Sequence, residues 1–416
     1  MHRKWLILIA VSIMFFFISA ATFMSLGVVL FEMIKALHWT QTEAGVSFSI
    51  LGLSCCLTSP VPMALASRIG ARWTMAAGGF TLAAGFALAA LTHALWQFYL
   101  GAAFMGLGFT LSANIPGVYL VAKWFPQKSG RIIGAYLMCG AFGGVAGPPA
   151  AQALIAAEGW RVYWAVLAAI AVGLGLLCGL LIRDKAPGSA DEAVDAGIDQ
   201  GAAPAWSYRA AVLTPQFAIL AAGMVVTEAC VTIVHSAAVI HFSKLGIPSS
   251  FAALMLSLQA LMATMAKGGS GLLGDWLNAR RLLVGGLVLE SLGMMVLGSA
   301  NSHAMAYTFA VLFGIGWGTA YLTITVLLIE YFGPATGSAV LSLVWLLTAA
   351  ASLGPAAAGI VADRFGTFTP VLDVSGALLL PLALAALLMR KPTSKGMSKQ
   401  EHDSILAQAV AIETTV

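Results

Sequence analysis

A lysine, a glutamate and a histidine interrupt stretches of the chain that are otherwise almost wholly apolar. Lys267 lies in the run from Ser250 to Asp275, and Glu228 and His235 lie in the run 217–242. An ionisable side chain at the centre of a membrane helix costs roughly 2.5–3.5 kcal/mol on insertion scales, so each position calls for a reason. In an aqueous cavity an ammonium can hold a small anion, and a carboxylate beside it can take up and release a proton.

Lys267 is the first candidate for a substrate-binding residue. If Asp275 marks the water-side end of its helix, Lys267 lies about 12 Å deeper, at about 1.5 Å per residue. Three glycines and a serine follow it within residues 268–271, and such small residues let a neighbouring helix approach closely. We therefore predict that Lys267 faces a central aqueous cavity and holds a small anion. The alternative is that its stem extends along the helix and places the ammonium at the membrane surface.

Glu228 is the candidate for proton coupling. It lies about 16 Å from the inner end of its span, a depth comparable to that of Lys267 on the next helix. Burial favours the protonated carboxyl group and an adjacent ammonium favours the charged one. We predict that Glu228 is the proton site, freed when a substrate carboxylate takes over Lys267; the alternative is a permanent structural pair. His235, on nearly the same helical face, either relays the proton or is a packed, hydrogen-bonded residue.

Other residues inside the apolar runs can complete the site. Asn114, Tyr119 and Tyr321 can offer hydrogen bonds to a carboxylate or hydroxyl. Four aromatic residues either line its apolar side or serve packing and lipid contact: Phe109, Tyr136, Trp317 and Trp345. Glu290 is expected to make a structural hydrogen bond or ion pair. The five cysteines fall in apolar runs without metal-ligand spacing, so neither a metal, a cofactor nor a disulfide is predicted.

The composition places the chain in a membrane. Of its 416 residues, 60% are hydrophobic and 9% are charged, and the mean hydropathy is +0.92, whereas soluble proteins carry about 25% charged residues. A water-soluble enzyme is excluded, and a membrane enzyme finds no metal-binding or Ser/His constellation to support it. The net charge of +4 does not indicate nucleic-acid binding, because the basic residues lie in loops.

The apolar runs predict an all-α membrane protein of twelve transmembrane helices, since spans this apolar must be helices. The predicted spans are 5–31, 44–66, 74–91, 98–122, 132–155, 162–182, 217–242, 251–274, 282–300, 304–329, 338–361 and 370–389. With both termini cytoplasmic, sixteen Lys and Arg residues fall in inside segments and four in outside loops. This bias predicts a multi-pass protein of the cell membrane, the bacterial inner (plasma) membrane, in that orientation.

The chain divides into two similar halves. We predict an N-terminal six-helix bundle (1–182), a cytoplasmic linker (183–212), a C-terminal six-helix bundle (213–389) and a cytoplasmic tail (390–416). A Gly-x-Gly segment, an aromatic pair and a later Gly-Pro recur between the halves at an offset of about 207–208 residues. Such duplication predicts two pseudo-symmetric bundles around a midplane transport site.

The loops after the second span of each half resemble the signature of the major facilitator superfamily. The second half has Gly271-Leu-Leu-Gly-Asp275 before Arg280-Arg281, and the first half keeps Arg68, Gly70 and Arg72 with Ser67 where the family usually has Asp. A related segment, Gly359-Ile-Val-Ala-Asp363-Arg364, follows the eleventh span. The resemblance implies the major facilitator fold and a charge latch, in which Asp at one helix end pairs with Arg of a neighbour in one conformation. Its members are Arg68, Arg72, Asp275, Arg280, Arg281, Asp363 and Arg364.

Within that superfamily the chain resembles the monocarboxylate transporters and oxalate–formate antiporters. The shared features are Lys123-Trp-Phe-Pro-Gln-Lys128-Ser-Gly130-Arg131 and the eighth span, where the family's substrate-binding Arg falls on Lys267. Mammalian-type members place an Asp where this chain has Ala263, so their proton coupling does not carry over directly. Dicarboxylate antiporters have a second basic residue in the eleventh span, which this chain lacks, and one cation suits one carboxylate.

The resemblance and the buried charges together predict a secondary active transporter of a small monocarboxylate such as lactate or pyruvate, coupled to protons and working by alternating access. Its partners would be the anion, protons and the lipid bilayer, without nucleic acid. The alternatives are proton-independent exchange of organic anions and import of a larger anion such as a siderophore. A non-transporting nutrient sensor is disfavoured because the tail 390–416 is short.

Overall fold

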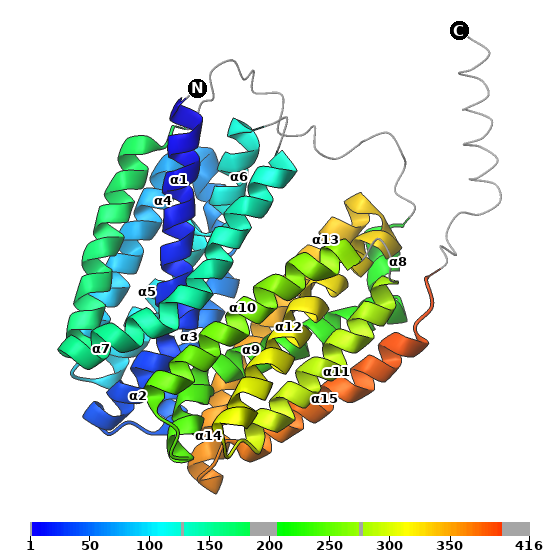
Figure 1. The fold of residues 1–416 in the computed structure, drawn as a ribbon. Coiled ribbons are helices and arrows are strands. Elements are labelled where there is room, and N and C mark those ends of the chain that lie inside the picture. The colour runs from blue at the N-terminus through cyan, green and yellow to red at the C-terminus, as the bar shows by residue number, and fades with distance from the viewer. Residues whose placement is uncertain (1, 126–128, 184–205, 274–277, 393–416) are drawn as a thin grey trace, which may run out of the picture.

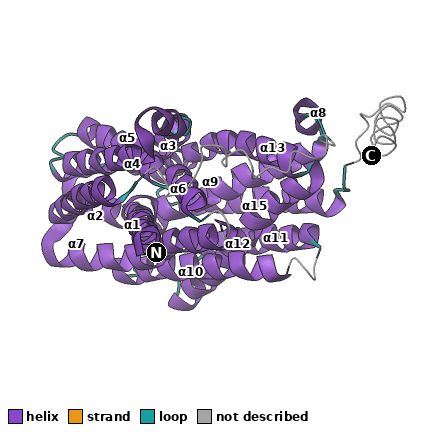
Figure 2. Ribbon diagram, turned by 90° about the horizontal axis from the view of Figure 1, so that it is seen from above, coloured by secondary structure: helices purple, strands orange, loops and turns teal. Residues whose placement is uncertain are grey.

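Two groups of helices, in contact at one end, make up the protein. The computed structural model describes residues 2–125, 129–183, 206–273 and 278–392. All regular elements within these ranges are helices, as the predicted all-α class requires. The helices α1 to α7 pack with one another, and α9 to α15 pack with one another (Figures 1 and 2). We call these groups the N-terminal bundle and the C-terminal bundle.

The N-terminal bundle contains helices interrupted by non-α segments. Its elements are α1 (His2–Ser19), the π-helix η1 (Ala20–Met24), α2 (Leu26–Leu37), α3 (Gln41–Thr58), α4 (Val61–Ala90), α5 (Leu95–Ser112), α6 (Asn114–Trp124) and α7 (Ser129–Leu181). The break between α5 and α6 falls at Ala113. Pro116 lacks the N–H that would bond to the carbonyl of Ser112, which explains the break.

The C-terminal bundle has a comparable sequence of elements. These are α8 (Tyr208–Val212), α9 (Pro215–Lys244), α10 (Ser249–Leu273), α11 (Ala279–Gly298), α12 (His303–Phe332), α13 (Pro334–Leu347), the 3-10 helix η3 (Thr348–Leu353), α14 (Gly354–Phe365) and α15 (Thr369–Leu388). The short helix α8 lies inside the predicted linker, most of which is outside the described residues, as is the tail from residue 393. Helical interruptions such as η1 and η3 occur at membrane depth where helices face protein or water rather than lipid.

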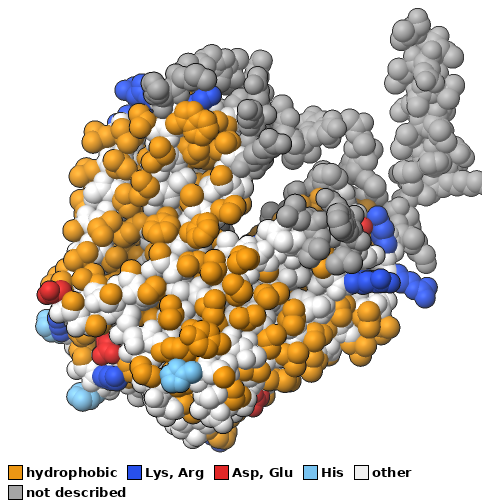
Figure 3. All heavy atoms as spheres, in the orientation of Figure 1, with side chains coloured by type: hydrophobic (Ala, Val, Ile, Leu, Met, Phe, Trp, Pro, Cys, Tyr) orange, Lys and Arg blue, Asp and Glu red, His pale blue; other side chains and the backbone are white. Residues whose placement is uncertain are grey.

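Ten of the described helices are long and apolar enough to cross a membrane. One of them holds two predicted spans, because α7 changes direction at Gly159, whose φ of 83° favours glycine. The second predicted span corresponds mainly to α3, which is not among the ten. The count of twelve therefore rests on dividing α7 at Gly159 and on including α3. The face of the bundles drawn in Figure 3 is largely apolar between charged groups near its two ends.

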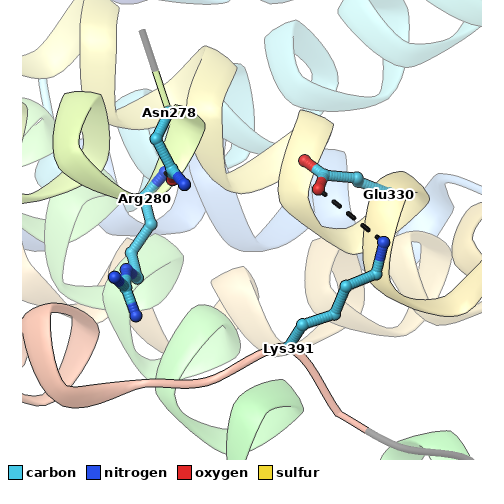
Figure 4. Close-up of polar contacts among 4 residues, drawn as sticks. All are labelled: Asn278, Arg280, Glu330 and Lys391. Atoms are coloured by element: carbon cyan, nitrogen blue, oxygen red, sulfur yellow. Dashed lines mark hydrogen bonds and ion pairs between the residues drawn. The ribbon is translucent and has the colours of Figure 1, made fainter.

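The two bundles repeat one another in detail. Arg72 of α4 donates through Nε to the carbonyl of Gly179 near the end of α7. Arg280 at the start of α11 donates to the carbonyl of Met389 just after α15. At that end of the C-terminal bundle Asn278 caps α11 by accepting from the Arg280 N–H at 2.9 Å, and Lys391 pairs with Glu330 at 3.9 Å (Figure 4). The equivalent arginines thus fasten equivalent helix ends, as the duplication predicts.

Candidate functional site

Four side chains from three helices of the C-terminal bundle form a cluster that includes Lys267. The Lys267 Nζ lies 4.0 Å from the centroid of the Trp317 ring and 4.3 Å from that of Tyr321. The Trp317 indole N–H donates to Glu228 Oε1 at 3.3 Å. We call Glu228, Lys267, Trp317 and Tyr321 the lysine cluster. Contacts of an ammonium with aromatic ring faces are attractive, and more so away from bulk water.

Close packing of α10 against α12 positions the lysine cluster. Trp317 and Tyr321 are four residues apart and so lie on one face of α12. A Cβ on Gly318 would meet the backbone of Ala263, and one on Gly314 would come within 3.3 Å of the Ala263 nitrogen. The two glycines therefore let the backbones of α10 and α12 touch, which brings the Lys267 stem to the ring faces of α12.

The lysine cluster faces the other bundle. Ala260, seven residues before Lys267 and hence on nearly the same face of α10, lies against Gly144 of α7. On the neighbouring turn of α10, the Ser257 hydroxyl donates to the carbonyl of Val145 at 2.6 Å. Cys56 of α3 lies within electrostatic range of Glu228. The half-buried Lys267 ammonium thus rests on α12 beside the bundle interface, not stretched toward a helix end.

Lys267 and Glu228 share this space without a direct bond. In the part of the chain that the structure describes they come within electrostatic range of each other but form no ion pair. The Tyr321 hydroxyl makes no hydrogen bond to any described residue. The ammonium and this hydroxyl are consequently both available to an oxygen-bearing ligand.

His235 lies on α9, seven residues beyond Glu228, and is buried inside the C-terminal bundle. Its ring is 4% exposed, meets the Trp317 ring edge-on at a centroid distance of 6.4 Å, and shares a 3.2 Å hydrogen bond between Nε2 and Gln259 Oε1. The Gln259 side chain is fully buried, and its Nε2 has no partner among the described residues. This geometry is that of a packed, hydrogen-bonded histidine, which was one of the two alternatives for His235. A role of His235 as a proton relay stays a prediction.

The predicted polar residues of α6 are not brought to Lys267 by any described contact. Asn114 begins α6, but its side chain lies outside what the structure describes. Tyr119 lies on α6, where the Lys123 ammonium approaches its ring at 5.7 Å. Tyr136 is fully buried, and its hydroxyl donates to the Ala113 carbonyl at 3.0 Å. It thus provides a hydrogen bond to the backbone at the break between α5 and α6. Phe109 packs edge-on against Phe23.

Glu290 lies behind the lysine cluster, on α11. It is fully buried and accepts a hydrogen bond from the Thr227 hydroxyl at 3.2 Å. Thr227 precedes Glu228 on α9 and therefore points about 100° away from it. Glu290 thus has the structural hydrogen bond that was expected of it.

The bundles are joined by a carboxylate at the end away from the termini. Asp363 of α14 accepts from the backbone N–H groups of Gln41 and Thr42 at 2.9 and 2.8 Å, and from the Thr42 hydroxyl at 2.5 Å. These N–H groups belong to the first turn of α3, which has no partners for them within its own helix. The negative charge also complements the positive end of the α3 dipole. In Figure 1 the bundles meet at this end and diverge toward the termini.

The other predicted latch residues make different contacts. Arg72 and Arg280 bond to backbone carbonyls inside their own bundles. Arg68 and Arg281 are exposed, and Arg364 lies against its neighbour Phe365 at 5.8 Å. Asp275 lies outside the described residues. The acidic partner that does cross between the bundles, Asp363, engages a helix end rather than an arginine.

Two residues near the lysine cluster were missed by the sequence reasoning. Gln259 is a polar residue eight positions before Lys267 in the same apolar run. Because a glutamine is rare in such a run, its presence could have marked Gln259 as a candidate. Cys56 carries no such signal, because a cysteine in an apolar run usually reads as a small apolar residue. Only the contact of α3 with η3 and α9 places it beside Glu228.

Comparison with known proteins gives one family and a shared fold. The model of the Major Facilitator Superfamily matches residues 11–345. The chain is 26% identical to monocarboxylate transporter 13 of Rattus norvegicus over 380 residues, which cover 88% of this chain and 85% of the relative. It is 27% identical to monocarboxylate transporter 11 of Homo sapiens over 337 residues, covering 77% and 69%.

Solved structures share the fold at lower sequence identity. A bacterial homologue of the human lysosomal transporter Spinster, in an inward-facing and occupied conformation, has a TM-score of 0.75 at 14% identity, covering 93% of this chain and 97% of that one. The nucleoside transporter NupG has a TM-score of 0.74 at 13% identity, covering 92% and 100%. These identities support a common arrangement of helices and nothing finer.

Proposed function

The chain belongs to the Major Facilitator Superfamily, a family of transporters, and we propose that it carries a small monocarboxylate across the membrane together with a proton. The observation that carries the proposal is the Lys267 ammonium at the bundle interface, held on ring faces and without a direct ion pair among the described residues. A carboxylate would bind there through the ammonium and the free Tyr321 hydroxyl. The curated relatives' description as monocarboxylate transporters agrees with one carboxylate for one ammonium.

Charge balance explains how the proton would be coupled. Before substrate binds, the charges of the Glu228 carboxylate and the Lys267 ammonium would offset each other. A bound carboxylate takes over the ammonium, and Glu228 then accepts a proton because its stabilising cation is engaged elsewhere. The site thus stays near neutral in both states, which keeps a net charge from crossing the low-dielectric interior.

Alternating access would follow from the contacts between the bundles. We infer that the described conformation is open toward the side of the termini and closed at the Asp363 end. With both termini cytoplasmic, as the basic residues predict, this conformation faces inward. Opening on the other side requires Asp363 to leave the first turn of α3, so Asp363 would act as the latch of the outer side.

Asp363→Ala is expected to weaken that latch. Three hydrogen bonds across the bundle interface are lost, and the population closed at this end should fall by about fivefold, the size of a lost helix cap. Spin labels at the exposed positions His38 and Arg364, in a background without the native cysteines, would report a shift toward longer distances. Asp363→Asn keeps one acceptor oxygen, so its distance distribution should lie between those of the wild type and Asp363→Ala. An unchanged distance distribution in Asp363→Ala would contradict the proposed role of Asp363 as a latch.

A second candidate is exchange of organic anions without protons. The hydrogen bond from Trp317 to Glu228 favours it, because an indole donor holds a carboxylate in its charged form. Under this alternative Glu228 remains a permanent counter-charge of Lys267. It predicts exchange that is insensitive to a pH gradient.

Uptake by the purified full chain in proteoliposomes tests both candidates. Labelled acetate, lactate, pyruvate and oxalate would be offered with and without an acid-outside gradient, with protein-free liposomes subtracting passive entry. Accumulation of monocarboxylates that requires the gradient supports proton symport. Exchange that ignores the gradient supports the second candidate, and transport of none of these acids contradicts both.

A further inference from the structure

Three aromatic rings form a row that begins at Lys267. The Trp317 and Tyr321 ring centroids are 6.3 Å apart, and those of Tyr321 and Trp345 are 5.7 Å apart. We call Trp317, Tyr321 and Trp345 the aromatic row. The Trp317 end is buried, with 8% of the residue exposed, whereas Trp345 of α13 is 39% exposed. The row therefore leads from the ammonium to a free ring surface.

The free end of the row lies near the end of α13, next to η3, which contacts α3 of the other bundle. Ser352, seven residues beyond Trp345, lies against α3, where a Cβ on Gly52 would collide with the Ser352 side chain. Trp345 also contacts Tyr321, whose ring holds the Lys267 ammonium on its face. The contact with Tyr321 places the Trp345 ring next to the lysine cluster.

We propose that the preferred substrate of this site is an aromatic monocarboxylate, with its carboxylate on Lys267 and its ring against Tyr321 and Trp345. The inference rests on the proposed function and narrows it. Ligand sites in proteins are mostly apolar and aromatic, with a few polar groups that fix orientation. Here the fixed polar groups are the Lys267 ammonium and the Tyr321 hydroxyl, and the remaining neighbours in the row are ring surfaces.

A short hydroxy or keto acid would use this arrangement poorly. The Trp317 N–H is already given to Glu228, so it is not free for the second oxygen of lactate or pyruvate. Acetate would engage the ammonium and leave the Tyr321 and Trp345 rings in water. An aryl ring covers them and adds an aromatic pair, which is worth up to about tenfold in affinity beyond the area that it buries.

The test compares phenylacetate with cyclohexylacetate, which matches it in size but lacks the π system, and with lactate. Labelled forms of each would be offered to proteoliposomes of the full chain at neutral pH, with protein-free liposomes subtracted. Wild type is expected to show about five- to tenfold higher kcat/KM for phenylacetate than for cyclohexylacetate. Trp345→Leu should abolish this preference, while Trp345→Phe should restore most of it. Trp96→Leu, which removes a tryptophan at the start of α5 that is 63% exposed, against 39% for Trp345, is the control.

The outcomes separate this inference from the function on which it rests. Equal handling of the two ring acids in wild type, or a preference that survives Trp345→Leu, overturns the role of the aromatic row. Saturable lactate uptake that phenylacetate neither shares nor inhibits overturns the aromatic substrate and leaves monocarboxylate transport standing. Absence of uptake for all three acids overturns both.

Discussion

Lys267→Ala is expected to abolish saturable monocarboxylate uptake. The change removes the cation that holds the substrate and leaves Glu228 without its counter-charge. Truncating one partner of a buried charge pair usually costs enough to lower binding by about a hundredfold or more. Initial rates of uptake into proteoliposomes across a range of substrate concentrations would show a loss of at least about a hundredfold in kcat/KM.

Two further variants separate charge from geometry at this position. Lys267→Arg keeps the positive charge and should retain part of the activity, because a guanidinium also stacks on aromatic rings but is broader and planar. Lys35→Ala removes a lysine whose side chain is 57% exposed and pairs with Glu32 at 3.7 Å, and should transport normally. All variants would be compared by thermal unfolding and by elution as a single species. Normal uptake by Lys267→Ala would exclude Lys267 as the anion site.

The architecture was predictable because a bilayer allows few alternatives. Apolar runs of the right length must be helices, and the offset of about 207–208 residues between matching motifs indicated a duplicated bundle. The match to the Major Facilitator Superfamily over residues 11–345 confirms the family. The bonds of Arg72 and Arg280 to equivalent helix ends show that the repeat extends to individual side chains.

The site was only partly predictable, because it depends on how each helix is rotated. Lys267 and Tyr321 were both candidates, but only the glycine contacts of Gly314 and Gly318 with α10 bring them together. Tyr119 shared the residue type of Tyr321 and lies elsewhere, since the break at Ala113 sets the rotation of α6. Sequence spacing shows which residues share a face of one helix, but not toward which neighbouring helix that face is turned.

Asp363 illustrates a second limit. Its position at a helix end suggested an arginine partner, whereas the described conformation pairs it with the first turn of α3. An unsatisfied helix N-terminus attracts a carboxylate as an arginine does, and the sequence does not say which of the two comes within reach. Contacts between the bundles also change with the conformation of a transporter, so one sequence is compatible with more than one partner.

Glu228→Gln is expected to uncouple substrate movement from the proton gradient. Glutamine resembles the protonated glutamate in shape but cannot release a proton, so the variant is fixed in the neutral form. Accumulation driven by an acid exterior should be lost, while exchange of labelled for unlabelled substrate across the membrane should persist. The carbonyl oxygen of glutamine can still accept the Trp317 N–H, so the ring arrangement around Lys267 should be retained.

Measuring gradient-driven uptake and equilibrium exchange in the same vesicles distinguishes the roles that Glu228 can have. Loss of the first with retention of the second assigns the proton to Glu228. Retention of wild-type pH dependence removes Glu228 from coupling and leaves it as the counter-charge of Lys267. Glu330→Gln alters an exposed carboxylate that pairs with Lys391 and should leave both measurements unchanged. Glu290→Gln tests the other buried carboxylate: because Glu290 bonds to Thr227 behind the lysine cluster, the variant should change stability more than coupling.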